Sequence, residues 1–153
     1  MKVMEFLNEK AICADLKATT KEKILEELVG LIMQAQTIKD REHLLRLLRE
    51  RESLGSTGIG QGVAIPHAKC DSVKKLVAAF GLSRSGVNFD SLDGEPVYIF
   101  FLLLAPEDSA GPHLKALARI SRLLKDKYFR DTLRAAVDEK TLLKVIKQED
   151  AKH

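Results

Sequence analysis

The sequence contains no tryptophan, few other aromatic residues and only two cysteines, Cys13 and Cys70. The two cysteines lie far apart in the chain and form no CxxC pair, which argues against a disulfide framework and against a thiolate metal site. We therefore expect both thiols to be reduced, and we expect neither a metal ion nor another cofactor.

Long hydrophobic runs are also missing. The longest run, at 97–105, is much shorter than the roughly 20 apolar residues of a membrane-spanning helix. The first residues, MKVMEFLNEKAIC, lack the basic start and uninterrupted apolar stretch of a signal peptide. These absences lead us to expect a soluble, cytoplasmic protein.

The sequence has little net charge of either sign. Lysine and arginine together number 25 against 22 acidic residues, which gives a formal charge of +3. Basic and acidic side chains alternate in REHLLRLLRERE (41–52), a pattern that favours a solvated helix face over a nucleic-acid-binding surface. What is present is an ordinary globular composition, 45% apolar and 31% charged over 153 residues, which predicts one folded domain.

Helices are predicted towards both ends of the chain. Thr20 and Asp40 precede amphipathic segments and should cap two helices, the second of which is expected to end at Gly55. Near the end of the chain, two more helices are expected around 126–136 and at 139–148, the last of them capped by the aspartate before it.

A further helix should begin at Ser109 or Gly111, with Pro112 in its first position, where a missing N–H group costs nothing. Residues at helical spacing should form its core-facing stripe: Leu114, Leu117, Ala118, Ser121 and Leu124.

Strands are predicted in the middle of the chain and near its start. The segments with a suitable apolar content are 11–18, 63–65, 76–82, 87–89 and 96–104. The first should be an edge strand, and a turn is expected at 83–86. The last is apolar at nearly every position, as in a central strand buried on both faces. This order of elements predicts a single-domain α/β fold, with a mixed central β-sheet flanked by helices on both faces.

The segment GSTGIGQGVAIPH (55–67) is too rich in glycine to be helical. Gly55 and Gly60 have the spacing that opens a phosphate-binding P-loop, but Gln61 and Gly62 stand where lysine and serine or threonine are required. A nucleotide site is therefore disfavoured. Two interpretations stay open: a tight turn with positive φ angles, or a loop whose N–H groups form an anion-binding nest near a reactive residue.

His67 is the candidate reactive residue. It follows Pro66 at the end of a short apolar strand, where α/β sheets place their sites. Most of an imidazole with an ordinary pKa of about 6.5 is neutral and nucleophilic at neutral pH. No serine–histidine–aspartate or cysteine–histidine arrangement is visible nearby, and no two histidines have metal-ligand spacing. The alternative is a structural histidine.

The longer segment RESLGSTGIGQGVAIPHAK (51–69) resembles the active-site segment of the IIA domains of the fructose–mannitol family of the phosphoenolpyruvate-dependent phosphotransferase system (PTS). Its GSTGIG is most similar to the nitrogen-regulatory branch and its close fructose-type relatives. The similarity extends over nearly the whole chain and implies one EIIA type-2 domain at 1–153. In that family the histidine after Ile-Pro, here His67, is phosphorylated by the carrier protein HPr or by its nitrogen-branch counterpart.

The resemblance connects three further residues with this site. Arg51 matches an active-site arginine, and His113, in GPHLKAL, matches a second active-site histidine at the start of a helix, where the helix dipole should favour its neutral form. Thr57 falls where the family has a hydroxyl close to the phosphate. Ala68 departs from the glycine that many members have after the histidine, which leaves the backbone angles there open.

The resemblance implies a phosphohistidine carrier. The regulatory interpretation is a nitrogen-type IIA whose phosphorylation on His67 changes which proteins it binds. The alternative is a free-standing fructose- or mannitol-type IIA that passes the phosphate to a IIB partner for sugar uptake. A third interpretation is a small-molecule-binding or hydrolytic domain. On that interpretation the matches of Arg51 and His113 to the family's active-site residues would be coincidental. Because the sequence includes no IIB domain, HPr-like domain or permease, we expect the regulatory type, with no nucleic-acid partner and no membrane insertion.

Overall fold

A mixed six-stranded sheet forms the centre of the molecule, and the computed structural model describes the whole chain, residues 1–153. Neighbouring strands follow the order β1-β5-β6-β3-β2, and β4 also pairs with β6. The strands are β1 (Leu7–Cys13), β2 (Gly58–Gly60), β3 (Val63–Ala64), β4 (His67–Lys69), β5 (Val77–Val87) and β6 (Val97–Ala105). β6 is antiparallel to β5 and parallel to β3 and β4, so the predicted mixed sheet is confirmed.

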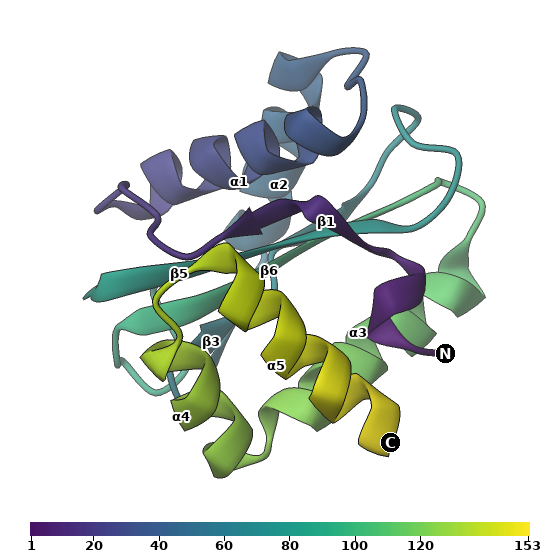
Figure 1. Cartoon of the computed structure of the whole chain (residues 1–153). Helices are drawn as coiled ribbons and strands as arrows, with labels where there is room; N and C mark the ends of the chain where they lie inside the picture. Colours follow the sequence, from purple (N-terminus) through teal and green to yellow (C-terminus); the bar gives the residue numbers. More distant parts are fainter.

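Helices cover both faces of the sheet, as predicted (Figure 1). One face carries α1 (Lys21–Ala35) and α2 (Arg41–Ser53). The other carries α3 (Ala110–Leu124), α4 (Lys127–Ala135) and α5 (Glu139–Lys152), together with a short 3-10 helix at Val3–Glu5. None of the helices combines the length and the apolar character needed to cross a membrane.

β6 supplies the centre of both hydrophobic cores. Because successive side chains of a strand point to opposite faces, Phe100 and Leu102 pack in the core under α1 and α2, whereas Phe101 and Leu103 pack in the core under α3, α4 and α5. All nine residues of the strand except Tyr98 are buried. The prediction of a central strand with two buried faces is therefore confirmed.

The predicted helix caps are present. The side chains of Thr20, Asp40 and Asp138 accept hydrogen bonds from the backbone N–H groups at the starts of α1, α2 and α5. α2 ends at Ser53, two residues before the expected Gly55.

Three predictions for the strand regions are wrong in their boundaries: the first strand, the turn at 83–86, and the separate strand at 87–89, of which only Val87 is in a strand and belongs to β5. The first strand is an edge strand, but it covers Leu7–Cys13 rather than 11–18. The expected turn at 83–86 does not reverse the chain, because β5 runs without interruption from Val77 to Val87. Its register against β6 shifts between Leu82 and Val87, and the hydroxyl of Ser83 accepts a hydrogen bond from the N–H of Gly86. These turn-forming residues thus form an irregularity within one strand.

The expected details of α3 are also corrected. Pro112 is the third residue of the helix rather than the first, which still falls in the turn whose N–H groups need no helical partner. Of the expected core stripe only Leu124 is buried: Leu114 is 68% exposed, Ala118 is exposed, and Leu117 and Ser121 are half-buried. The buried face instead consists of His113, Ala116, Arg119, Ile120, Leu123 and Leu124.

The topology fixes where the glycine-rich segment ends. β3 and β4 both pair with β6 in parallel, with Val63 opposite Ile99 and His67 opposite Leu103. The chain between these short strands therefore follows β6 towards its carboxyl end, and β4 begins at His67.

Candidate active site

A surface cavity of about 650 Å³ lies between the end of α2, β4 and the start of α3. Arg51, His67 and His113, three of the residues expected from the sequence, are therefore brought together although they are far apart in the chain. The complete lining is Leu47, Glu50, Arg51, Ser53, Leu54, His67, Ala68, Lys69 and His113.

His67 is half-buried, and one of its ring nitrogens is held by the backbone. Nδ1 lies 2.8 Å from the carbonyl oxygen of Ile65. Because a carbonyl can only accept a hydrogen bond, Nδ1 carries the proton of the neutral ring, and Nε2 keeps its lone pair. Burial lowers the pKa of His67, the hydrogen bond to Ile65 opposes that shift, and the charge of Arg51 adds to it. The ring is therefore neutral and nucleophilic through Nε2 at neutral pH.

His113 meets His67 edge to face from the first turn of α3. The two ring centroids are 5.4 Å apart and the planes cross at 73°. Burial lowers the pKa of His113 to about 4, and the charges of His67 and Lys69 act in the same direction. Burial is therefore the main cause of the expected neutral form. The Nε2 atom of His113 is buried without a hydrogen-bond partner, which is rare for a polar atom.

Arg51 lies in the last turn of α2 and forms no ion pair. Its Nη1 donates a hydrogen bond to the carbonyl oxygen of Gly55 at 2.8 Å, so its partner is neutral. Arg51 and Lys69, which is exposed on β4, place two positive charges in the cavity lining, against one negative charge from Glu50. This arrangement suits an anionic group next to His67.

Thr57 does not line the cavity. It is buried, its backbone N–H donates to Oε1 of Glu52 at 3.0 Å, and its hydroxyl donates to Oε2 of the same carboxylate. The predicted phosphate contact of Thr57 therefore finds no support in this geometry, because the hydroxyl proton is already committed to Glu52.

The open question at Ala68 has a simple answer. Ala68 lies within β4 and has no positive φ angle, so this backbone does not require glycine. Positive φ angles occur earlier in the segment, at Gly55, Gly60, Gln61 and Gly62. The glycine-rich loop thus contains the tight turns that the first interpretation of it expected.

Several cavity residues were not found from the sequence. Leu47 is an apolar residue of α2 that packs partly against the core, and Leu54, just after the helix, is 85% exposed. Their apolar side chains form part of the cavity wall. Helical periodicity alone does not distinguish such residues from core residues. Lys69 could have been found, since residues at i and i+2 of a strand share a face and His67 is two positions away.

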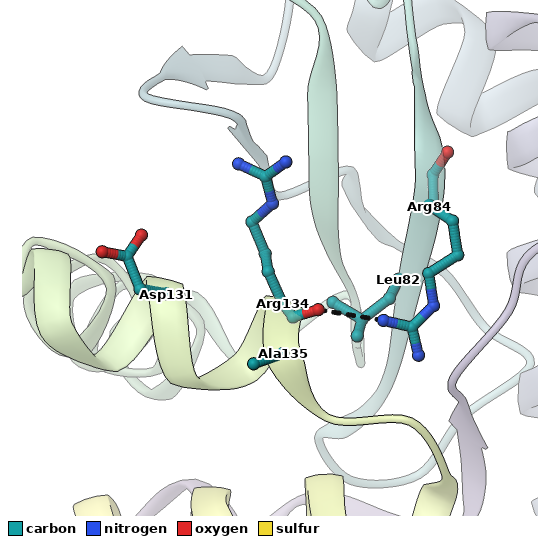
Figure 2. A pocket seen from close by; sticks show the side chains of 6 residues that line it. Leu82, Arg84, Asp131, Arg134 and Ala135 are labelled. Atoms are coloured by element: carbon teal, nitrogen blue, oxygen red, sulfur yellow. Dashed lines mark hydrogen bonds between the residues drawn. The ribbon is translucent and has the colours of Figure 1, made fainter.

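A second cavity, of about 290 Å³, lies between β5 and α4 (Figure 2). The guanidinium of Arg84 donates hydrogen bonds to the carbonyl oxygens of Arg134 and Ala136, at the end of α4. The guanidinium of Arg134 lies 3.8 Å from the centre of the Tyr98 ring. Both arginines therefore have partners within the fold, Arg84 as a cap for the helix end and Arg134 in a cation–π contact.

Comparison with known proteins identifies a family whose matched region includes the first cavity. Residues 5–149 match the family described as the phosphoenolpyruvate-dependent sugar phosphotransferase system, EIIA 2. The matched region contains all three elements that build the cavity and both histidines.

The relatives include both regulatory and sugar-transport proteins. The chain is 38% identical to the nitrogen regulatory protein of Bradyrhizobium diazoefficiens, over 95% of each chain. It is 39% identical to the fructose-specific EIIABC component of Bacillus subtilis, over 98% of this chain but only 24% of that component, so it spans about a quarter of the larger protein.

A solved structure agrees with both the sequence match and the fold. The nitrogen regulatory protein IIA-Ntr from Neisseria meningitidis superimposes with a TM-score of 0.85 at 34% identity, covering 93% of this chain and 97% of the other. The chain therefore belongs to the EIIA type-2 family of the phosphoenolpyruvate-dependent phosphotransferase system, whose members are phosphoryl transfer proteins.

Proposed function

We propose that this chain is a cytoplasmic phosphocarrier that accepts a phosphoryl group on Nε2 of His67 from HPr or a nitrogen-type HPr homologue. The observation that supports this most directly is the bond between Nδ1 of His67 and the carbonyl of Ile65, which leaves Nε2 as the nucleophilic nitrogen. In the transfer, the lone pair of Nε2 forms a bond to phosphorus. The bond between phosphorus and the donor's side chain breaks, and the donor keeps that electron pair.

Arg51 and His113 are the proposed partners of the transferred group. Phosphoryl transfer depends on alignment and on stabilisation of charge, and little covalent help is needed from the protein. The guanidinium of Arg51 can exchange its neutral carbonyl partner for a phosphoryl oxygen, which is a stronger, charge-assisted hydrogen bond. The unpartnered Nε2 of His113 would gain a hydrogen bond to the same group if it carries the ring's proton.

The domain extent is also proposed. The family match ends at residue 149, yet both ends of the chain belong to the same packed unit. The carboxylate of Asp150 accepts hydrogen bonds from the backbone N–H groups of Val3 and Met4, and it pairs with Arg119 of α3. These contacts support one EIIA type-2 domain over 1–153.

The regulatory type is the preferred form of this function. The Bradyrhizobium and Neisseria regulatory proteins match over nearly their whole lengths, which supports a switch whose phosphorylation changes the proteins that it binds. The alternative is a fructose- or mannitol-type IIA that passes the phosphate to a IIB partner. It is favoured by the equally high identity with the fructose-specific component of Bacillus subtilis.

Transfer kinetics with defined partners test the proposal. The protein is mixed with phosphoenolpyruvate and either enzyme I with HPr or their nitrogen-branch counterparts, and then with fructose- and mannitol-type IIB domains. The regulatory type predicts faster phosphorylation by the nitrogen-branch carrier and no onward transfer to either IIB domain. Rapid transfer to a IIB domain would support the sugar-transport alternative, and the absence of phosphorylation by both donors would contradict the proposal as a whole.

A further inference from the structure

The carboxylate of Glu52 is buried next to the active-site cavity without lining it. Its side chain is 6% exposed, and Nζ of Lys21, from the start of α1, lies 3.1 Å from Oε1. The same carboxylate accepts both the backbone N–H and the hydroxyl of Thr57. Its partners are therefore an ammonium group and two hydrogen-bond donors, which is how a buried charge is tolerated.

A continuous set of hydrogen bonds leads from this carboxylate to the ring of His67. Thr57, held by Glu52, accepts a hydrogen bond through its own carbonyl from the N–H of Ile65 at 3.0 Å. The carbonyl of Ile65 then holds Nδ1 of His67 at 2.8 Å. Each hydrogen bond in this set therefore starts from a residue whose position the preceding hydrogen bond has fixed.

The backbone of Ile65 needs this support, because Ile65 lies between β3 and β4 and outside the regular hydrogen bonding of the sheet. β3 ends at Ala64 and β4 begins at His67, and Pro66 between them has no N–H to donate. The bond to Thr57 is thus the only backbone hydrogen bond made by the N–H of Ile65, and Pro66 is tied to the sheet only through its carbonyl, which accepts from Leu103 at 3.0 Å. The orientation of the Ile65 carbonyl consequently depends on where Thr57 is held.

Arg51 is connected to the same region through the chain segment that leads to Thr57. The carbonyl that Arg51 binds belongs to Gly55, in the short connection between α2 and Thr57. Glu52 pairs with Lys21 and Thr57, whereas the neighbouring Arg51 binds only the carbonyl of Gly55.

We propose that Glu52 and Thr57 are positioning residues for His67: the carboxylate fixes Thr57, and the carbonyl of Thr57 fixes the backbone of Ile65, whose own carbonyl keeps the proton on Nδ1. This inference rests on the proposed function only in taking His67 as the phosphorylated residue. It gives Thr57 a structural role behind the ring, in place of a direct contact with phosphate.

The test is the tautomer of His67, measured by long-range ¹H–¹⁵N NMR of the imidazole in the unphosphorylated protein, with His67→Ala to assign the signals. Four variants are compared: Glu52→Gln, Thr57→Val, Thr57→Ser and Glu42→Gln. Valine removes only the hydroxyl at similar size, and serine keeps it. Glu42→Gln is the matched control, because Glu42 lies on the same helix in an exposed ion pair with Arg41.

We expect the wild type to show the Nδ1–H form and both Glu52→Gln and Thr57→Val to show a mixture of tautomers. In those two variants the phosphorylation rate should fall roughly tenfold, as is typical when a group that orients an active-site histidine is removed. Thr57→Ser and the control should match the wild type in both readouts. Circular dichroism and thermal unfolding establish that each variant is folded, and if Glu52→Gln is not, the valine–serine pair decides.

The outcomes separate the possible errors. If folded Thr57→Val loses activity but keeps the Nδ1–H form, Thr57 contacts the phosphate directly and the positioning role is wrong. If the tautomer and the rate are both unchanged, the role is purely structural and the inference is also wrong. If the wild type is not phosphorylated on His67, the proposed function fails, whereas the NMR comparison still stands by itself.

Discussion

At the scale of single residues, the chemistry of the site depends on the protonation states of His67 and His113. Burial and the charge of Arg51 lower the pKa of His67, and burial lowers that of His113 to about 4. Both rings are therefore neutral at neutral pH, and the positive charges of the cavity lining come from Arg51 and Lys69. A neutral His67 is a nucleophile, and a neutral His113 can contribute a hydrogen bond but no charge.

The pH dependence of phosphorylation follows from the lowered pKa of His67. Because only the neutral ring attacks phosphorus, the rate should stay constant as the pH falls from about 8 and should decline only below the ordinary histidine pKa of about 6.5. Arg51→Gln removes a charge that lowers this pKa, so its decline should begin at higher pH. Its plateau rate should also fall, on the order of 100-fold, because a transition-state donor is lost.

These changes are measured as initial rates over a pH series with the donor in excess. NMR titration of the ring gives the pKa of each protein independently. An identical pKa in wild type and Arg51→Gln would show that the guanidinium does not act on His67.

His113 should make the fold sensitive to acid. Its pKa in the folded protein, about 4, is below the value of about 6.5 in the unfolded chain, so the unfolded chain binds the proton first as the pH falls. The free energy of unfolding is unaffected above that unfolded pKa and should decrease through the interval between the two values, by about 3 kcal/mol at most.

Urea unfolding at neutral and at mildly acidic pH measures this loss, with His113→Leu as the comparison. The variant should lose less stability on acidification than the wild type does. Equal losses in both proteins would mean that His113 is protonated as easily in the folded state as in the unfolded one.

At the scale of secondary-structure elements, features that depend on neighbouring residues could be predicted from the sequence, and features that depend on tertiary contacts could not. The caps at Thr20, Asp40 and Asp138 were predictable because a cap depends on a few neighbouring residues. The inward face of α3 was not, because His113 and Arg119 occupy core positions and a hydrophobic pattern does not assign polar residues to a core.

The same limit explains β5 and the candidate site. Ser83 and Gly86 resemble a turn locally, but after a register shift β5 pairs with β6 again at Val87, so the strand continues beyond them. Arg51, His67 and His113 were assigned by resemblance to a family rather than by periodicity. Glu52 went unnoticed, because a charged residue near a helix end is usually solvated, and only the tertiary contact with Lys21 shows that this one is buried.

The cap of α2 allows stability and activity to be separated. The Asp40 carboxylate accepts a hydrogen bond from the N–H of His43 at 3.0 Å, at the opposite end of the helix from Arg51. Asp40→Ala should lower the free energy of unfolding by about 1 kcal/mol. Because the cavity end of α2 is held by other contacts, the phosphorylation rate of the folded protein should be unchanged. Chemical denaturation and initial-rate measurements on one preparation check both, and a large loss of rate would mean that the whole helix moves with its first turn.

At the scale of the whole molecule, one buried carboxylate, that of Asp150, holds α3 through an ion pair and the N-terminal residues through hydrogen bonds. Arg119 of α3 lies 2.7 Å from the carboxylate of Asp150, which also binds the N–H groups of Val3 and Met4. Although burial alone would raise it, these hydrogen bonds hold the pKa of Asp150 below its ordinary value.

Removing one partner of this pair should be costly. Asp150→Ala leaves the buried guanidinium of Arg119 without its counter-charge and should lower the free energy of unfolding by about 3 to 5 kcal/mol. The double variant Arg119→Met/Asp150→Leu should recover part of this loss, since an apolar pair needs no counter-charge. Asp131→Ala breaks an exposed ion pair with Lys127 and should change stability by less than about 1 kcal/mol. Equal effects of Asp150→Ala and Asp131→Ala would contradict the account of this contact.

The most direct test of the central claim is the intact mass of the protein after incubation with phosphoenolpyruvate, enzyme I and HPr, or with their nitrogen-branch counterparts. We predict the mass of a single phosphoryl group, lost on mild acid treatment, in the wild type and in His43→Ala, whose histidine is half-buried in the first turn of α2, at the opposite end of the helix from Arg51. The same increase should be absent in His67→Ala. A phosphoryl group that persists in His67→Ala would contradict the assignment of His67 as the phosphorylated residue.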